Sequence, residues 1–138
     1  MILSETLSGQ IVSSARSYAG TQFDWCTFNC VHFVAEVYWG LGIEFPRLAR
    51  YGLPPRDFHL SGDEFLCMPI GHSVFLKRKE TLAPTRYWTH IAIIIEQDRL
   101  IHCTRNLGSG VIISTSQELL GAYDLALSED RLFERIIA

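Results

Sequence analysis

From the sequence we expect neither a signal peptide nor a membrane-spanning segment. Residues 1–5 contain no basic group and no long apolar core, so they do not form a signal peptide. The longest purely aliphatic run, residues 91–95, is far too short to span a bilayer. We therefore expect no membrane insertion and a protein that is cytoplasmic as synthesised, unless a route that needs no signal peptide exports it.

A strong excess of one charge is also missing. The formal net charge is −3, which gives no general attraction to nucleic acid or to an anionic membrane. The 138 residues, 48% of them apolar, are an ordinary globular composition. A chain of this length can bury about two-thirds of its unfolded surface, so it can fold without disulfides or metal. We expect a single domain, residues 1–138, and no nucleic-acid partner.

The spacing of the cysteines does not match the common metal motifs. The four cysteines stand at positions 26, 30, 67 and 103, with no Cys-x-x-Cys and no His-x-x-x-His pair. Without an export signal, disulfides are not expected. Zinc remains an alternative, because a site could be assembled from Cys26, Cys30, His32, His102 and Cys103. We expect no cofactor.

Two amphipathic segments early in the chain predict helices. The first has apolar residues at 7, 11, 15 and 18, with Ser4 as its N-cap. The second begins at Cys30, directly after the good N-cap residue Asn29, and ends near Gly40. At a helix start, unpaired backbone N–H groups and the helix dipole favour a thiolate. Cys30 is therefore a candidate nucleophile.

Strands dominate the rest of the chain. Prolines interrupt residues 43–70, and whether this excursion covers the site as a lid stays open. The pattern predicts strands at 73–78, 89–95, 99–104, 110–115 and 132–137, and a short helix at 116–120. Helices followed by strands indicate an α+β fold, with N-terminal helices packed on a mostly antiparallel sheet of five to six strands.

Two histidines lie on neighbouring predicted strands, and the turn between the strands decides whether they meet. His90 opens one strand, and His102 follows twelve residues later. A two-residue turn at 97–98 would put them on opposite faces. A three-residue loop at 96–98 pairs His102 with Ala92 and brings both histidines to one face. In that register Cys30 can act as nucleophile, His90 as base and His102 as the group that orients the base.

Several short motifs follow one another in a characteristic order. They are Asn-Cys-Val-His-Phe-Val at 29–34, Gly-Ile-Glu-Phe-Pro at 42–46, Gly-His-Ser-Val-Phe-Leu at 71–76 and His-Ile-Ala-Ile-Ile at 90–94. With a second His at position 102, they resemble the NlpC-type cysteine peptidases, a papain-like family that cuts stem peptides of bacterial cell walls. The resemblance implies a papain-like fold, a peptide or muropeptide substrate, and Cys30, His90 and His102 as catalytic residues.

Residues around the proposed nucleophile differ from the family pattern. Phe23 stands where the family usually has a Tyr, and His32 stands in place of a Gly. Aromatic residues also flank the two motifs that carry Cys30 and His90. The residues that we expect to contact substrate are Phe23, Trp25, His32, Tyr87 and Trp88.

Three functions stay open at this point. The first is a cysteine hydrolase that cleaves an amide bond, most directly in a cell-wall stem peptide. The second is a thiol acyltransferase or deamidase acting on a lipid or protein. The third is a non-catalytic binding or assembly module of the same fold. In the absence of a signal peptide, a phage tail or a secretion system is a candidate partner for delivery.

Overall fold

Helices pack on one antiparallel sheet. The computed structural model describes residues 4–43, 59–60, 69–78, 90–105 and 109–128. In chain order the elements are α1 (Glu5–Ser17), α2 (Cys30–Gly40), β1 (His59–Leu60), β2 (Ser73–Arg78), β3 (His90–Glu96), β4 (Arg99–Thr104), β5 (Gly110–Thr115), α4 (Ser116–Ala122) and β6 (Tyr123–Ser128). The six strands are ordered β1-β6-β2-β3-β4-β5, and every described pairing is antiparallel. The predicted α+β class is confirmed.

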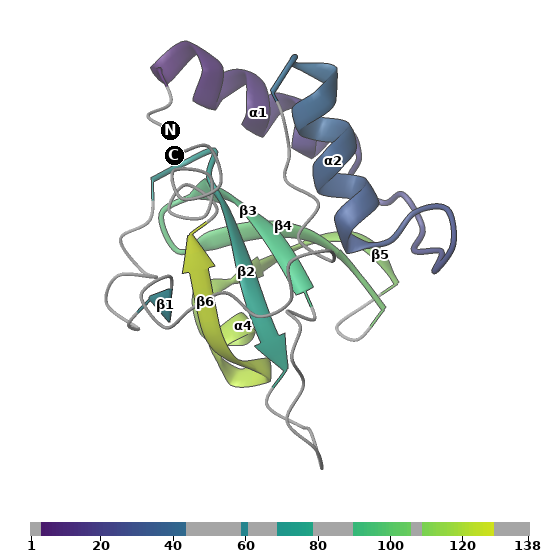
Figure 1. Cartoon of the computed structure of the whole chain (residues 1–138), viewed down its shortest axis with the longest axis vertical. Helices are drawn as coiled ribbons and strands as arrows, with labels where there is room; N and C mark the ends of the chain where they lie inside the picture. The colour runs from purple at the N-terminus through teal and green to yellow at the C-terminus, as the bar shows by residue number, and fades with distance from the viewer. Residues whose placement is uncertain (1–3, 44–58, 61–68, 79–89, 106–108, 129–138) are drawn as a thin grey trace.

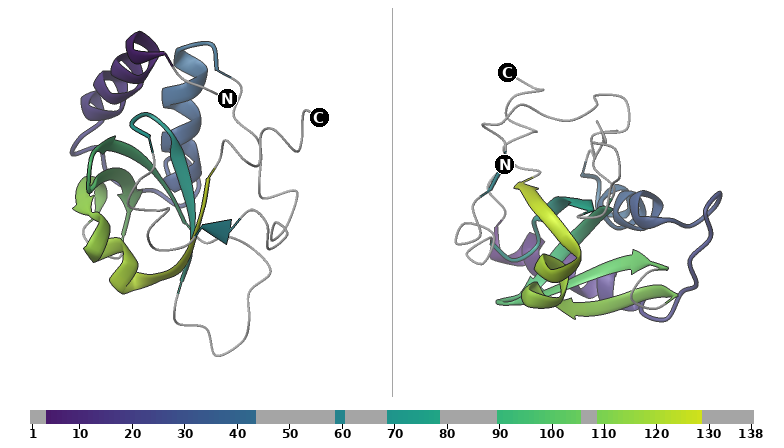
Figure 2. Two further views of the ribbon diagram at one scale, coloured as in Figure 1. Left: turned by 90° about the vertical axis from the view of Figure 1, so that its left-hand side faces the viewer. Right: turned by 90° about the horizontal axis from the view of Figure 1, so that it is seen from below.

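The helices cover the sheet from two sides. Helices α1 and α2 lie together on one side, and α4 lies on the other (Figures 1 and 2). Within the described ranges, no helix has the length and apolar character that crossing a bilayer requires. The predicted strand 132–137 and most of the excursion 43–70 lie outside the described residues.

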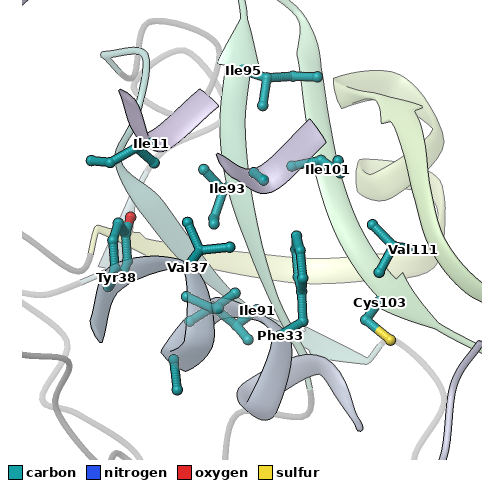
Figure 3. Close-up of a cluster of buried hydrophobic side chains, with 13 residues drawn as sticks. Ile11, Phe33, Val37, Tyr38, Ile91, Ile93, Ile95, Ile101, Cys103 and Val111 are labelled. Atoms are coloured by element: carbon teal, nitrogen blue, oxygen red, sulfur yellow. The ribbon is translucent and has the colours of Figure 1, made fainter. Parts of the chain in front are cut away.

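The main core lies between α1, α2 and one face of the sheet. Its buried members are Ile11, Ala15, Phe33, Val34, Ala35, Val37, Tyr38, Ile91, Ile93, Ile95, Ile101, Cys103 and Val111 (Figure 3). Alternate residues of the same strands face a second cluster, formed by Val74, Leu76, Ala92, Ile94, Leu100, Leu119 and Tyr123. Because side chains alternate along a strand, β3 is buried on both faces. Each fully buried large apolar side chain contributes about 1.5–3 kcal/mol.

The β3–β4 hairpin reaches its register through a β-bulge. Glu96 pairs with Arg99, so the turn between them has two residues. Past Glu96 the register shifts by one residue, and Ile93 then pairs with Ile101. The same register places residue 92 opposite His102. The turn thus has two residues, as in the first of the two alternatives, but the bulge supplies one more residue and produces the register of the second, in which His102 lies opposite Ala92.

The loop that leads to Cys30 is fastened to the start of β5. The Gly20 N–H donates to the Val111 carbonyl at 3.1 Å, and the Val111 N–H donates to the Thr21 carbonyl at 2.8 Å. Gly110 has a φ of +121°, and a Cβ added there would lie 2.2 Å from the Thr21 carbonyl oxygen. Glycine is therefore required at this position, and the close approach holds the loop against the sheet.

Candidate active site

An N-cap defines the position of Cys30. The Asn29 side chain accepts from the N–H groups of Val31 and His32 at 3.0 and 3.1 Å. His32 Nδ1 in turn accepts from the Asn29 N–H at 3.2 Å, which completes a capping box. Cys30 is thereby the first residue of α2, as predicted. His32, which was expected to contact substrate, is exposed and has this local role at the helix start.

Cys30 as a whole residue is half-buried at the start of α2. Burial raises the pKa of Cys30, and this outweighs the backbone N–H groups of Ile91, Val31 and Cys30 itself, which lower it. The helix start therefore does not produce a thiolate by itself, and Cys30 needs a base. Ile91 directly follows His90, so the thiol lies against the strand end that carries the candidate base.

His90, His102 and Ser114 form a hydrogen-bonded row across β3, β4 and β5. His90 Nε2 lies 2.6 Å from His102 Nδ1, and His102 Nε2 lies 2.7 Å from Ser114 Oγ. All three side chains are buried, with exposed fractions of 6%, 0% and 2%. The two histidines therefore meet on one face, which was the condition for their acting together. Ser114 was not predicted, because only the register of β5 reveals that it faces His102.

The surroundings of the row keep His102 neutral and hold the His90 ring. Burial lowers the pKa of His102 to about 4, and the charge of Glu118 acts in the opposite direction. The His90 ring stacks on Tyr123, with centroids 5.2 Å apart and planes 10° from parallel. Near neutral pH His102 therefore has one ring N–H and one lone pair for hydrogen bonding.

Cys103 lies behind the site in the main core. Its thiol donates to the Phe28 carbonyl at 3.6 Å. Burial, followed by the electrostatic effect of Cys30, raises the pKa of Cys103 to about 11. Cys103 therefore stays a neutral, buried thiol on the face opposite His102, as the strand alternation predicted.

Aromatic and cationic groups gather in and beside the loop before Cys30. Phe23 and Trp25 meet edge to face with ring centroids 5.5 Å apart. Trp25 is 63% exposed, and Arg105 Cζ lies 4.7 Å from the centroid of its ring. Arg105, which follows β4, was missed because nothing in its sequence position points to Trp25. The predicted contact residues Tyr87 and Trp88 lie outside the described residues.

Most amide groups in this loop already have acceptors. The Asp24 side chain accepts from the N–H groups of Cys26 and Thr27, both at 2.9 Å. Asp24 and Phe28 exchange two backbone hydrogen bonds. Among the described residues, the Cys30 N–H has no acceptor outside its own side chain. It is thus the backbone donor best placed for a negatively charged oxygen formed beside the thiol.

The zinc alternative gains no support from the geometry. Both ring nitrogens of His102 are engaged by His90 and Ser114. In the ranges that the structure describes, no three His, Cys, Asp or Glu side chains form a metal-binding group.

Solved structures share this architecture. An NLP/P60 family protein from Staphylococcus aureus superposes with a TM-score of 0.64 at 22% identity, over 92% of this chain and 42% of that one. The NlpC/p60 domain of the peptidoglycan hydrolase SagA gives 0.61 at 22% identity, over 88% and 97%. The peptidoglycan hydrolase RipB from Mycobacterium tuberculosis gives 0.60 at 15% identity, over 88% and 64%. The chain has the NlpC/P60 fold.

The NlpC/P60 fold confirms the predicted papain-like arrangement of N-terminal helices on an antiparallel sheet. No protein-family profile and no curated protein matches the sequence, so the likeness is one of structure. The chain spans less than half of the S. aureus protein but nearly all of the SagA domain.

Proposed function

We propose that the protein is a cysteine hydrolase that cleaves an amide bond in a bacterial cell-wall stem peptide. The observation that carries this proposal is the placement of Cys30 against the backbone of β3, at the strand end where the row of His90, His102 and Ser114 begins. Peptidoglycan hydrolases with the same fold support the substrate class. In this proposal residues 1–138 form a single catalytic domain.

The proposed chemistry assigns one role to each group. His90 Nε2 is hydrogen-bonded to His102, and we assign the uptake of the Cys30 proton to the other ring nitrogen, Nδ1. The thiolate attacks the carbonyl carbon, and the Cys30 N–H stabilises the oxyanion. The charged His90 then protonates the leaving amine, and a thioester on Cys30 remains. Neutral His90 removes a proton from the water that hydrolyses this thioester.

The loop before Cys30 supplies the proposed substrate contacts. Phe23 and Trp25 present aromatic surface, and Arg105 adds a cation above the Trp25 ring. Together they fit a peptide that has apolar side chains and a free carboxylate. Tyr87 and Trp88 stay predicted members of the same groove. Cytoplasmic synthesis and delivery by a phage tail or a secretion system also stay predictions.

Hydrolysis of purified muropeptides, followed by mass spectrometry, tests the proposal. We expect the parent protein to release cleaved stem peptides and Cys30→Ala to release none. Cys26→Ala is the matched control, because Cys26 is an exposed thiol four residues away; it should cleave like the parent. Equal product from the parent and Cys30→Ala would refute the proposal.

A binding module of the same fold is the second candidate. It is favoured by the raised pKa of Cys30 and by Phe23 in place of a hydroxyl-bearing Tyr. This candidate predicts equal binding of stem peptides by the parent and Cys30→Ala, measured by calorimetry, with no turnover by either. An acyltransferase or deamidase would instead form an acyl adduct on Cys30 with an ester or a glutamine-containing protein, which intact-mass measurement detects.

A further inference from the structure

The row of polar groups does not end at His102. Its Nε2 lies 2.7 Å from Ser114 Oγ, on the neighbouring strand β5. Ser114 is 2% exposed and pairs with Leu100 across the sheet. The next residue, Thr115, caps α4 by accepting from the Glu118 N–H at 3.2 Å. Strand pairing on one side and a helix cap on the other thus fix the position of the Ser114 hydroxyl.

Two proton arrangements satisfy both hydrogen bonds of a neutral His102. In the first, His102 donates from Nε2 to the Ser114 oxygen and accepts at Nδ1 from His90. In the second, the Ser114 hydroxyl donates to Nε2, and His102 donates from Nδ1 to His90. Only the first arrangement lets His90 carry protons on both ring nitrogens. A His90 imidazolium beside a Cys30 thiolate therefore requires the first arrangement.

We propose that Ser114 is a positioning residue that accepts the Nε2 proton of His102 and so keeps His102 Nδ1 free to accept from His90. This role rests on the proposed function, in which His90 takes the Cys30 proton. A charged His90 polarises its bond to His102, which strengthens the next bond to Ser114, so the two bonds act together. Without the hydroxyl, the His102 N–H would be buried and unsatisfied in the arrangement that the chemistry needs.

Several other groups face this row and bear on its protonation. Tyr123 stacks on His90 from β6, and the charge of Glu118 acts on His102 from α4. On the other face, Cys103 of β4 interacts electrostatically with Cys30. In the described part of the chain, the hydrogen-bond partner of His102 Nε2 is Ser114. Removal of this hydroxyl therefore perturbs the row at its end and leaves the other groups in place.

NMR of protein labelled with ¹⁵N in the histidine rings shows which nitrogen of His102 carries the proton. We expect Nε2 in the parent and a large share of Nδ1 in Ser114→Ala. Iodoacetamide alkylation of Cys30 should show an apparent pKa about one unit higher in Ser114→Ala, and a rate near neutral pH about tenfold lower. Ser114→Thr, which keeps a hydroxyl, should restore the parental tautomer and the parental rate.

Ser116→Ala is the matched control, because Ser116 is also a buried serine, 3% exposed, at the start of α4. It should change neither readout. A proton on Nδ1 in the parent would overturn the proposal, and so would parental tautomer and alkylation in folded Ser114→Ala. Urea unfolding confirms that each variant folds. If Ser114→Ala does not fold, Ser114→Cys takes its place, because its sulfur is only a weak acceptor. Parental tautomer and alkylation rate in Ser114→Cys, or a proton on His102 Nδ1 in the parent, would then overturn the proposal.

These readouts need no substrate, so the two proposals can fail separately. If the parent does not cleave muropeptides, but Ser114→Ala shows the expected shifts in tautomer and alkylation, the proposed function is refuted and the role of Ser114 is retained. A parent that cleaves muropeptides, with no effect of Ser114→Ala on tautomer, alkylation or kcat, would end the role of Ser114 alone.

Discussion

Replacement of Gly110 by alanine should strongly destabilise the fold. The new Cβ would lie 2.2 Å from the Thr21 carbonyl oxygen, 3.0 Å from its carbon and 3.2 Å from the Gln22 Cα. All three are backbone atoms, so no side-chain rotation relieves the overlap. The φ of +121° adds strain of about 1–3 kcal/mol for a residue that has a Cβ. The loop must move away from β5, or β5 must bend.

The hydrogen bonds beside Gly110 account for the rest of the expected loss in unfolding free energy. If the loop moves, the bonds from Gly20 N–H to Val111 and from Val111 N–H to Thr21 are lost or stretched. Each is worth about 0.5–1.5 kcal/mol. We therefore expect the free energy of unfolding to fall by about 3 kcal/mol. This corresponds to a drop of about 10 °C in Tm for a domain of this size.

Urea unfolding followed by circular dichroism measures this loss. Gly9→Ala is the control, because Gly9 lies inside α1 and a Cβ added there would meet no atom within 4 Å. That change should stabilise the protein by about 0.5–1 kcal/mol, since alanine is the better helix former. If Gly110→Ala unfolds at the same urea concentration as the parent, the close approach of loop and strand is refuted.

Two further predictions concern His102 and the cap of α2. Because burial lowers the native pKa of His102 to about 4, the unfolded chain binds a proton first as the pH falls below 6.5. Unfolding free energy should drop by about 3 kcal/mol from pH 6.5 to 4. The drop should be smaller in His102→Asn, where the lowered pKa values of buried His72 and of Asp24, which accepts backbone hydrogen bonds, still contribute; a variant profile as steep as the parent's would contradict this. Asn29→Ala removes the acceptor of two N–H groups and should cost about 1 kcal/mol in urea unfolding, whereas Asn29→Asp keeps the cap; equal losses would exclude the capping role.

Elements with strong local signals were predicted well from the sequence. The bounds of β2, β4 and β5 match the predicted strands, and Asn29 caps α2 as expected. Alternation of apolar residues and a good N-cap residue act over a few positions, so the sequence displays them directly. β6 was missed, because Tyr123–Ser128 follows a helix without a turn signal and is defined by its pairing with β2.

Features of the candidate site that depend on distant residues could not be predicted. Ser114 meets His102 only because the pairing of β4 with β5 aligns them, and a lone serine in a strand carries no signal. Whether the pKa of Cys30 is raised or lowered depends on how deeply its thiol is buried where α2 packs against β3, and no local sequence pattern reveals this. The pairing of His90 with His102 was predicted conditionally, since the sequence did not settle the register of the hairpin.

The β-bulge beside Glu96 makes the placement of His102 and the packing of the main core depend on the same register. Along β4, Leu100 and His102 face one side, while Ile101 and Cys103 face the core under the helices. A chain that formed the hairpin without the bulge would exchange the two sides. It would bury an imidazole beneath α1 and α2 and lose core side chains at the same time. Loss of the row of His90, His102 and Ser114 and loss of the core would therefore occur together, so we expect no stable fold in which only the row is displaced.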